Sequence, residues 1–473
     1  MLNKEEIEEI KINCLKFKEY LNSNNDKNII HLLNKFGKVP SEFTCVDELV
    51  KLFEKGNDKL SLLVIKNLAK ISNPKLLDIY KNIILNLTNS ELRREAASAI
   101  GRMRSKHNID YLIELLNDYD PEVILQAIRG LMSFKKEEKI HNILIELINH
   151  PNEIVSHYID SELNKNNIKN IQHSSINKLL ANSLVEGDVL NILKSIKEEE
   201  IHLTFTSPPY YNARDYSIYK SYNEYIEFLK KVFIEIHRVT KEGRFFLINT
   251  SPIIIPRVSR NQSSKRYPIP FDLHCMMDEI GWEFIDDIIW VKPEASVKNR
   301  NAGFLQHRKP LAYKPNSRTE MIMVYRKKTT KLIDWNLKQY NEDVINESLI
   351  EDGYETSNVW HIDPKSDKTH SAVFPIELCN KVVKYYSLKG DLVFDPFAGS
   401  GTFAKSAYNL DRNFFITEIN PPYVDRIKEN LDFDNNLLTT DKERMKYYTS
   451  KEFKYLMENI DDTTSGGCKK NNN

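Results

Sequence analysis

The chain has 473 residues, of which 41% are hydrophobic and 10% aromatic, enough to build two or three domains with buried cores. Lys plus Arg and Asp plus Glu both number 67, so the net charge gives no evidence for a nucleic-acid partner. The sequence contains no signal-peptide core and no apolar run of membrane-spanning length, which predicts a cytoplasmic protein without a membrane partner.

The cysteines are few and far apart along the chain. No pair has C-x-x-C spacing and none has a His partner at metal-ligand spacing, which predicts no metal site. We therefore expect scattered reduced thiols in the core, at Cys14, Cys45, Cys275, Cys379 and Cys468.

The N-terminal part, residues 1–165, has a helical pattern throughout. Residues 1–17 predict one charged amphipathic helix, and similar segments then begin at Asn57, Asn89, Asp120 and Pro151. Apolar residues occupy the fourth and eighth positions of each copy: Leu60 and Val64, Leu92 and Ala96, Val123 and Ala127, Ile154 and Tyr158. The pattern resembles short HEAT-type repeats, stacked helix pairs whose surface could dock a protein partner or serve only as a spacer.

An asparagine-rich connector follows, and from residue 176 to 435 short β-rich runs alternate with helical segments. This alternation predicts an α/β domain with a doubly wound, largely parallel sheet. Residues 436–473 predict a helical or disordered C-terminal tail, because the sequence ends in polar and glycine-rich residues.

The run Ile201–Thr206 has the composition of a buried strand and ends in Ser207-Pro208-Pro209-Tyr210. The two prolines stiffen this corner and remove two backbone N–H groups, so the Ser207 hydroxyl and nearby carbonyls can accept hydrogen bonds from an amino group. Taken alone, the motif would equally fit a turn that ends a strand and packs its tyrosines.

A second strand, in "DLVFDPF", runs into a glycine-rich turn between Asp395 and Gly401. In a doubly wound sheet this is where nucleotide-like ligands bind, but the spacing matches neither G-x-G-x-x-G nor a P-loop. The next strand carries Glu418 near its end, where an acid can hold ribose hydroxyls.

"SPPY" upstream of "FDPFAGSGT" resembles the β class of amino-methylating DNA methyltransferases, over about residues 183–430. The resemblance implies a Rossmann-like sheet in circularly permuted motif order and S-adenosyl-L-methionine as cofactor. It implies that the turn contacts the methionine end of the cofactor, that Glu418 holds the ribose and that Asp188 approaches the adenine. The implied cofactor residues are Asp188, His370, Phe374, Pro375, Asp395, Pro396, Phe397, Gly399, Ser400, Gly401 and Glu418.

The exocyclic amine of a base is a poor nucleophile because its lone pair is delocalised into the ring. Hydrogen bonds to Ser207 and Pro208 would localise that lone pair, with Pro209 stiffening the corner and Tyr210 stacking on a flipped base. In the family a serine in this motif usually accompanies the N4 amine of cytosine; the N6 amine of adenine stays as the alternative.

Two segments, 243–271 and 295–319, contain basic residues and no acids, as loops that contact DNA phosphates do. Arg244 lies in the first segment, 243–271, and is expected to contact phosphates with it. We expect target recognition in residues 295–368 and DNA contacts from Arg257, Arg260, Lys265, Arg266, Lys298, Arg300, Arg308 and Lys309.

The sequence as a whole predicts a DNA (cytosine-N4)-methyltransferase of a restriction-modification or related protection system, acting on double-stranded DNA as a monomer or homodimer. Competing hypotheses are a HEAT-type scaffold with a non-catalytic methyltransferase module, and methylation of RNA or another amine.

Overall fold

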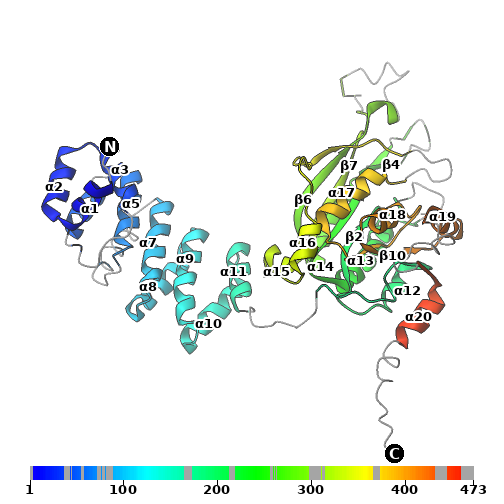
Figure 1. Cartoon of the computed structure of the whole chain (residues 1–473), viewed down its shortest axis with the longest axis horizontal. Helices are drawn as coiled ribbons and strands as arrows, with labels where there is room; N and C mark the ends of the chain where they lie inside the picture. Colours follow the sequence, from blue (N-terminus) through cyan, green and yellow to red (C-terminus); the bar gives the residue numbers. More distant parts are fainter. Residues whose placement is uncertain are drawn as a thin grey trace, which may run out of the picture. The chain divides into compact units, whose positions relative to one another are not determined.

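The computed structural model describes residues 4–36, 43, 45–54, 58–71, 76, 80, 89–163, 173–211, 219–255, 259, 261–262, 264–297, 310–311, 315–365, 373–431 and 445–459. The chain divides into two compact units, Met1–Ile168 and Lys169–Asn473, and each is described by itself (Figure 1).

The first unit is all-helical over its described residues (Figure 1). The helices are α1 (Lys4–Ile12), α2 (Cys14–Ser23), α3 (Asp26–Lys35), α4 (Val46–Glu54), α5 (Asp58–Leu68), α7 (Ser90–Arg102), α8 (Ile109–Glu114), α9 (Pro121–Leu131), α10 (Glu138–Glu146) and α11 (Glu153–Leu163). The predicted single helix at the N-terminus is in fact two helices. Asn13 separates them because its side chain accepts the backbone N–H groups of Leu15 and Lys16 and so starts α2.

The repeats begin at equivalent capping residues. Asn89 and Asp120 accept backbone N–H groups at the starts of α7 and α9, and Asn152 does the same at the start of α11. In the first three copies both predicted apolar positions are buried, as at Leu92 and Ala96. These copies therefore have the predicted register.

In the fourth copy the predicted register is wrong by one residue. Ile154 is 57% exposed, whereas Val155 and Ile159 are fully buried. The copy starts at Asn152 rather than Pro151. Two neighbouring apolar residues, 154 and 155, both fit the pattern, and only the capping residue distinguishes the two registers.

Helices α7 and α9 approach each other closely at two glycines. A Cβ atom on Gly130 would lie 2.9 Å from the Cα of Gly101 and 2.8 Å from a methyl group of Leu112. Neither glycine can gain a side chain without moving its neighbour, so the stacking distance of these two repeats depends on them.

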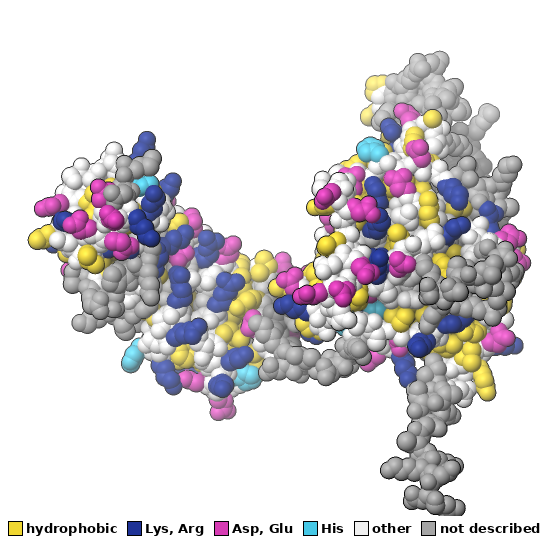
Figure 2. All heavy atoms as spheres, in the orientation of Figure 1, with side chains coloured by type: hydrophobic (Ala, Val, Ile, Leu, Met, Phe, Trp, Pro, Cys, Tyr) yellow, Lys and Arg dark blue, Asp and Glu magenta, His cyan; other side chains and the backbone are white. Residues whose placement is uncertain are grey.

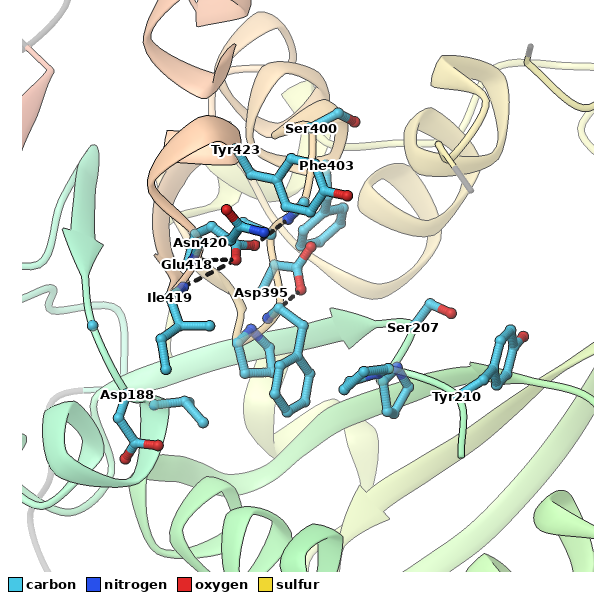
Figure 3. A pocket seen from close by; sticks show the side chains of 18 of the residues that line it. Asp188, Ser207, Tyr210, Asp395, Ser400, Phe403, Glu418, Ile419, Asn420 and Tyr423 are labelled. Atoms are coloured by element: carbon cyan, nitrogen blue, oxygen red, sulfur yellow. Dashed lines mark hydrogen bonds between the residues drawn. The ribbon is translucent and has the colours of Figure 1, made fainter. Parts of the chain in front are cut away.

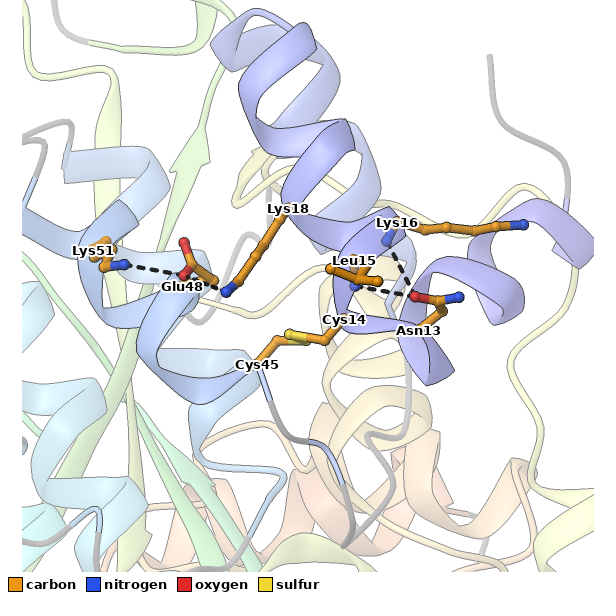
Figure 4. The surroundings of a disulfide bond; sticks show 8 residues. All are labelled: Asn13, Cys14, Leu15, Lys16, Lys18, Cys45, Glu48 and Lys51. Atoms are coloured by element: carbon orange, nitrogen blue, oxygen red, sulfur yellow. Dashed lines mark hydrogen bonds and ion pairs between the residues drawn. A yellow bond between two sulfur atoms is a disulfide. The ribbon is translucent and has the colours of Figure 1, made fainter.

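Cys14 and Cys45 form a disulfide bond between the start of α2 and the residue before α4, with Cα atoms 5.5 Å apart (Figure 4). The prediction of reduced core thiols is wrong for this pair, and Cys275 is exposed rather than in the core. Cys379 is buried, and Cys468 lies outside the described residues. A spacing of 31 residues gave no signal for the pairing, because it depends on how the first helices pack.

The second unit contains a nine-stranded sheet in the order β11-β1-β10-β9-β2-β3-β7-β6-β8. The strands are β1 (Ser183–Glu186), β2 (Ile201–Thr206), β3 (Thr240–Thr250), β6 (Trp282–Val291), β7 (Thr319–Lys327), β8 (Val359–His361), β9 (Leu392–Asp395), β10 (Asn413–Glu418) and β11 (Lys446–Thr449). Among these described strands, only β7 runs antiparallel to its neighbours. A separate hairpin joins β4 (Ile253–Ile255) to β5 (Lys265–Tyr267).

Helices cover both faces of the sheet. Buried residues of α12 (Val189–Leu193), α13 (Tyr222–Val239), α14 (Ile269–Ile280) and α20 (Ser450–Glu458) form one core. Those of α17 (Ile376–Tyr386), α18 (Thr402–Asn409) and α19 (Pro421–Leu431) form the other. Central strands such as β2 are buried at every position, which explains their continuous apolar and β-branched composition. The small helices α15 (Ile333–Leu337) and α16 (Glu342–Glu347) follow β7.

One part of the sheet differs from the sequence prediction. Residues 446–449, expected in a helical or disordered tail, form the edge strand β11, which pairs in parallel with β1. Residues 319–327, within the range expected for target recognition, form β7 between β3 and β6.

Arg244 was expected in a phosphate-contacting loop, and this prediction is wrong. The residue lies in β3, is buried, and donates to the carboxylate of Asp391 and to the carbonyl of His202. Counting charges along the sequence cannot separate a buried ion pair from an exposed basic loop.

None of the described helices combines the length and the apolar character needed to cross a membrane.

Candidate active site

The Ser-Pro-Pro-Tyr corner lies where β2 ends, at the carboxyl edge of the sheet. Strand β9 is the neighbour of β2, and its last residue is Asp395. The two strand ends are joined directly, because the Thr206 hydroxyl donates to Oδ1 of Asp395 over 2.7 Å. Residues 189 positions apart in the chain therefore meet at one edge of the sheet.

The glycine-rich turn after β9 depends on backbone conformations that favour glycine. Gly399 has φ 54° and Gly401, the residue before α18, has φ 73°. A Cβ atom on Gly401 would also lie 3.2 Å from the side chain of Ile427. The turn is closed by a hydrogen bond from the Gly401 N–H to the Ala398 carbonyl.

Glu418, at the end of β10, holds this turn in place. Its Oε2 accepts the Gly399 N–H at 2.9 Å, and its Oε1 accepts the N–H groups of Ile419 and Asn420. Three acceptor positions of the carboxylate are thus occupied, and about one of its four remains for a ligand hydroxyl. Burial raises the pKa of Glu418 above its ordinary value.

Asp395 is the second buried carboxyl of the site. Oδ1 accepts from both Thr206 and the Phe397 N–H, while no hydrogen bond from the described residues reaches Oδ2. Burial raises the pKa of Asp395 to about 7, and the nearby charge of Glu418 acts in the same direction. A cation beside Oδ2 would favour the carboxylate form.

These elements line one pocket of about 560 Å³ (Figure 3). In this view Ser207 and Tyr210 lie on one side, Asp395 in the middle, and Asp188 and Glu418 on the other side. The predicted residues that line the pocket are Asp188, Ser207, Pro208, Pro209, Tyr210, Phe374, Asp395, Pro396, Phe397, Gly399, Ser400 and Glu418. Pro375 and Gly401 are not in the lining; they precede α17 and α18. His370 lies outside the described residues.

Sequence reasoning missed about half of the lining. Ile419 and Asn420 directly follow Glu418, so their place at the same strand end could have been inferred. Tyr219 and Phe228, which add aromatic surface before and within α13, carry no motif. The other missed lining residues are Gly187, Val189, Ala398, Thr402, Phe403, Pro421 and Tyr423.

The two tyrosines of the corner have different surroundings. Tyr211 is buried in a cluster of rings, with its centroid 5.1 Å from that of Tyr267 and 5.4 Å from that of Tyr222. Tyr210 lines the pocket, and burial together with the charge of Glu320 raises its pKa above the ordinary value. Tyr210 therefore stays a neutral phenol at physiological pH.

Of the expected DNA contacts, the structure describes only Lys265 and Arg266. Both are exposed on β5. The next residue, Tyr267, packs on Tyr222 with ring centroids 4.5 Å apart, which joins the hairpin to the ring cluster around Tyr211. On the visible face of each unit, Lys and Arg side chains lie among Asp and Glu (Figure 2). The other expected contacts lie outside the described residues: Arg257, Arg260, Lys298, Arg300, Arg308 and Lys309.

Comparison with known proteins gives the family. A profile of the DNA methylase family (N6/N4 type) matches residues 201–429, and a profile of HEAT repeats matches residues 80–158. The Type II methyltransferase M.ScaI of Streptomyces caespitosus is 31% identical over 252 residues, which cover 51% of this chain and 78% of that protein. This chain belongs to the DNA methylase family. The predicted family, the fold class and the HEAT-like repeats are thereby confirmed.

Other DNA methylases are similar over about half of the chain. The Type II methyltransferase M.Cfr9I of Citrobacter freundii is 26% identical over 54% of this chain and 90% of that protein. The match to the Type II beta methyltransferase M.BslI of Bacillus sp. (strain NEB-606), 28% identical, covers 51% of this chain and only 26% of that protein.

Among solved structures, a putative DNA modification methylase of Thermus thermophilus, complexed with S-adenosyl-L-methionine, aligns with TM-score 0.45 and 23% identity over 56% of this chain and 97% of that one. PvuII DNA methyltransferase (cytosine-N4-specific) aligns with TM-score 0.40 and 19% identity over 59% of this chain and 93% of that one.

Proposed function

We propose that this DNA methylase transfers a methyl group from S-adenosyl-L-methionine to the N4 amine of cytosine in duplex DNA. The observation that carries the proposal is that one pocket contains both the Ser207 corner and the Asp395–Glu418 region. The similarity to proteins named Type II methyltransferases supports a role in restriction-modification or a related protection system, in the cytoplasm.

The described residues fit the cofactor. The one open acceptor position on Glu418 suits a ribose hydroxyl, and Oδ2 of Asp395 suits the ammonium of the methionine end. Asp188 and Ile419 would flank the adenine, and Phe374 would cover the pocket from the other side. When bound, the cofactor supplies an electrophilic methyl group attached to a sulfonium.

Ser207 and Pro208 would then activate the amine. The Ser207 hydroxyl and the Pro208 carbonyl accept its two N–H groups, which localises the nitrogen lone pair toward the pocket. Prolines at 208 and 209 leave the corner without two backbone donors and hold it rigid. Positioning of this kind can contribute several kcal/mol to a methyl transfer.

The base would reach the pocket by flipping out of the duplex and stacking on the ring of Tyr210. We assign cytosine because a serine occupies the first position of the corner, a preference of the family rather than a consequence of geometry. Lys265 and Arg266 would contact phosphates, and residues 295–368 are proposed to contain the recognition region.

Nucleoside mass spectrometry tests the proposal. The purified protein is incubated with mixed-sequence duplex DNA and labelled S-adenosyl-L-methionine, with single-stranded RNA as a matched control substrate. We expect labelled N4-methylcytosine from the duplex alone. N6-methyladenine would keep the reaction and overturn the choice of base. Label in the RNA only, or in neither substrate, would contradict DNA methylation and favour the competing hypotheses.

A further inference from the structure

The strand β11 and the helix α20 form the C-terminal end of the described chain, and they pack against the turn that follows β1. In the described part of the sheet, β11 pairs only with β1, in a register that sets Thr449 opposite Glu186. Glu186 is in turn opposite Glu418 on β10. The next residues after Glu186, Gly187 and Asp188, line the pocket.

A hydrogen bond joins β11 to this turn. The Tyr447 hydroxyl donates to the Glu186 carboxylate, and Lys428 of α19 lies over the Tyr447 ring at 3.4 Å. The side chain that ends β1 is therefore held from the edge strand, one residue before the pocket begins.

Close packing joins α20 to the same turn. A Cβ atom on Gly187 would lie 2.7 Å from the Cβ of Ser450, and the φ of Gly187 is +150°. On its other side the Gly187 N–H donates to the Glu418 carbonyl over 2.9 Å. Gly187 is thus enclosed between α20 and the strand that carries Glu418.

The supporting elements are themselves anchored without a ligand. Thr449 and Glu452 form a capping box that fixes the start of α20. Phe453 is fully buried and stacks on Phe415 of β10 at 5.7 Å. Asp188 accepts the Asn191 N–H and so caps α12, which also fixes the C-terminal end of the Glu186–Asp188 turn.

We propose that residues 446–458 act as a brace that positions the Glu186–Asp188 turn and thereby sets the affinity for the adenine end of the cofactor. Tyr447 and Ser450 are positioning residues: neither lines the pocket, and both act through the turn. The ligand named here rests on the proposed function.

Tyr447→Phe is the test, with Tyr448→Phe as its matched control. Tyr448 is the next residue of the same strand and packs into the opposite core. We expect Tyr447→Phe to raise the Kd for S-adenosylhomocysteine and the KM for the methyl donor about five- to tenfold, because the turn is no longer held in the position that binds the ligand. The lost hydrogen bond should also lower the Tm by a few degrees. The kcat and the KM for DNA should stay at their wild-type values, as should every constant of Tyr448→Phe.

Glu186→Ala provides a second measurement. Because Tyr447 acts through Glu186, the double variant should bind S-adenosylhomocysteine no more weakly than the weaker single variant. Additive losses would overturn the brace, as would unchanged binding in Tyr447→Phe or an equal loss in Tyr448→Phe. A wild-type protein that binds no S-adenosylhomocysteine would instead contradict the proposed function itself.

Discussion

The two units of this protein differ in how far apart along the chain their contacting residues lie. In the helical unit the helices pack on others that are close in the chain, as α4 does on α5 and α7 on α9. Helices α7, α9 and α11 repeat one pattern of cap and buried positions. In the second unit, the methylase unit (Lys169–Asn473), the pocket joins residues at the carboxyl ends of β2, β9 and β10, and β2 lies far from the other two along the chain. Sequence changes should therefore act locally in the first unit, whereas in the second a single residue can affect the whole site.

The largest expected effect is on the stability of the methylase unit. Arg244→Ala leaves the buried carboxylate of Asp391 without its cation, which should lower the free energy of unfolding by about 3–5 kcal/mol. Urea denaturation measures it. Arg266→Ala, at an exposed position, is the control and should change stability by less than about 0.5 kcal/mol. An equal response of both variants would remove the distinction between buried and exposed basic residues.

Ser207→Ala should act on chemistry without acting on stability. We expect the rate of methyl transfer under single-turnover conditions to fall about 100-fold, because the amine loses one acceptor. Binding of S-adenosylhomocysteine should not change. Ser207→Thr keeps the hydroxyl and should keep most of the rate; an undiminished rate in Ser207→Ala would rule out the hydrogen-bond role.

Gly130→Ala tests the helical unit. The new methyl group would overlap Leu112 and the backbone of Gly101, so the local unfolding free energy should fall by about 1–3 kcal/mol. Hydrogen exchange of peptides from residues 89–163 measures it, with Ser98→Ala on α7 as control. Methyl transfer to a short duplex should stay within about twofold of wild type. A large loss of activity would show that the two units are coupled.

The pH dependence of cofactor binding should report on Asp395. Its pKa of about 7 in the free protein means that the carboxylate is mostly protonated at pH 6 and mostly ionised at pH 8. A bound ammonium needs the ionised form, so the Kd for S-adenosylhomocysteine should be about tenfold higher at pH 6 than at pH 8. Isothermal titration calorimetry at both values measures it. Asp395→Asn should bind weakly and equally at both; the same slope in this variant would assign the titration to another group.

The smallest expected effect is at the hairpin. Lys265→Ala should weaken binding to duplex DNA about threefold at physiological salt and reduce the salt slope by about one. Fluorescence anisotropy across a salt series measures both quantities. Lys338→Ala, at another lysine of the same unit, is the control. An unchanged slope in Lys265→Ala would remove this residue from the DNA contacts.

The meeting of the Ser207 corner and the Asp395 turn could be predicted from sequence, because parallel strands that end in motifs bring those motifs to one edge of the sheet. The buried positions of three repeats could be predicted for a similar reason, since each signal lies within one helix. What could not be predicted depended on contacts between distant segments. Arg244 has the same charge as Arg266, and only its partner Asp391 places it in the core.

The edge strand β11 illustrates the same limit. Lys446–Thr449 is four residues long and has no alternating pattern of its own, so nothing in it marks a strand until β1 offers an edge. The lining residues Tyr219 and Phe228 were missed because aromatic residues in a helix or next to one usually fill a core. The disulfide between Cys14 and Cys45 likewise depends on packing rather than on spacing.

The strand order also fixes a sequence of events during synthesis. Strand β2 and the Ser207 corner leave the ribosome early. One of the two neighbours of β2 is β9, whose last residue is made 189 positions after Thr206. Strand β1 likewise cannot pair until β10 and β11 have been made. The helical unit needs no such delay, since each repeat meets its partner as soon as the next one emerges. A nascent chain therefore carries a finished helical unit while its catalytic strand still has an open edge, and any chaperone that protects this protein during translation should bind there.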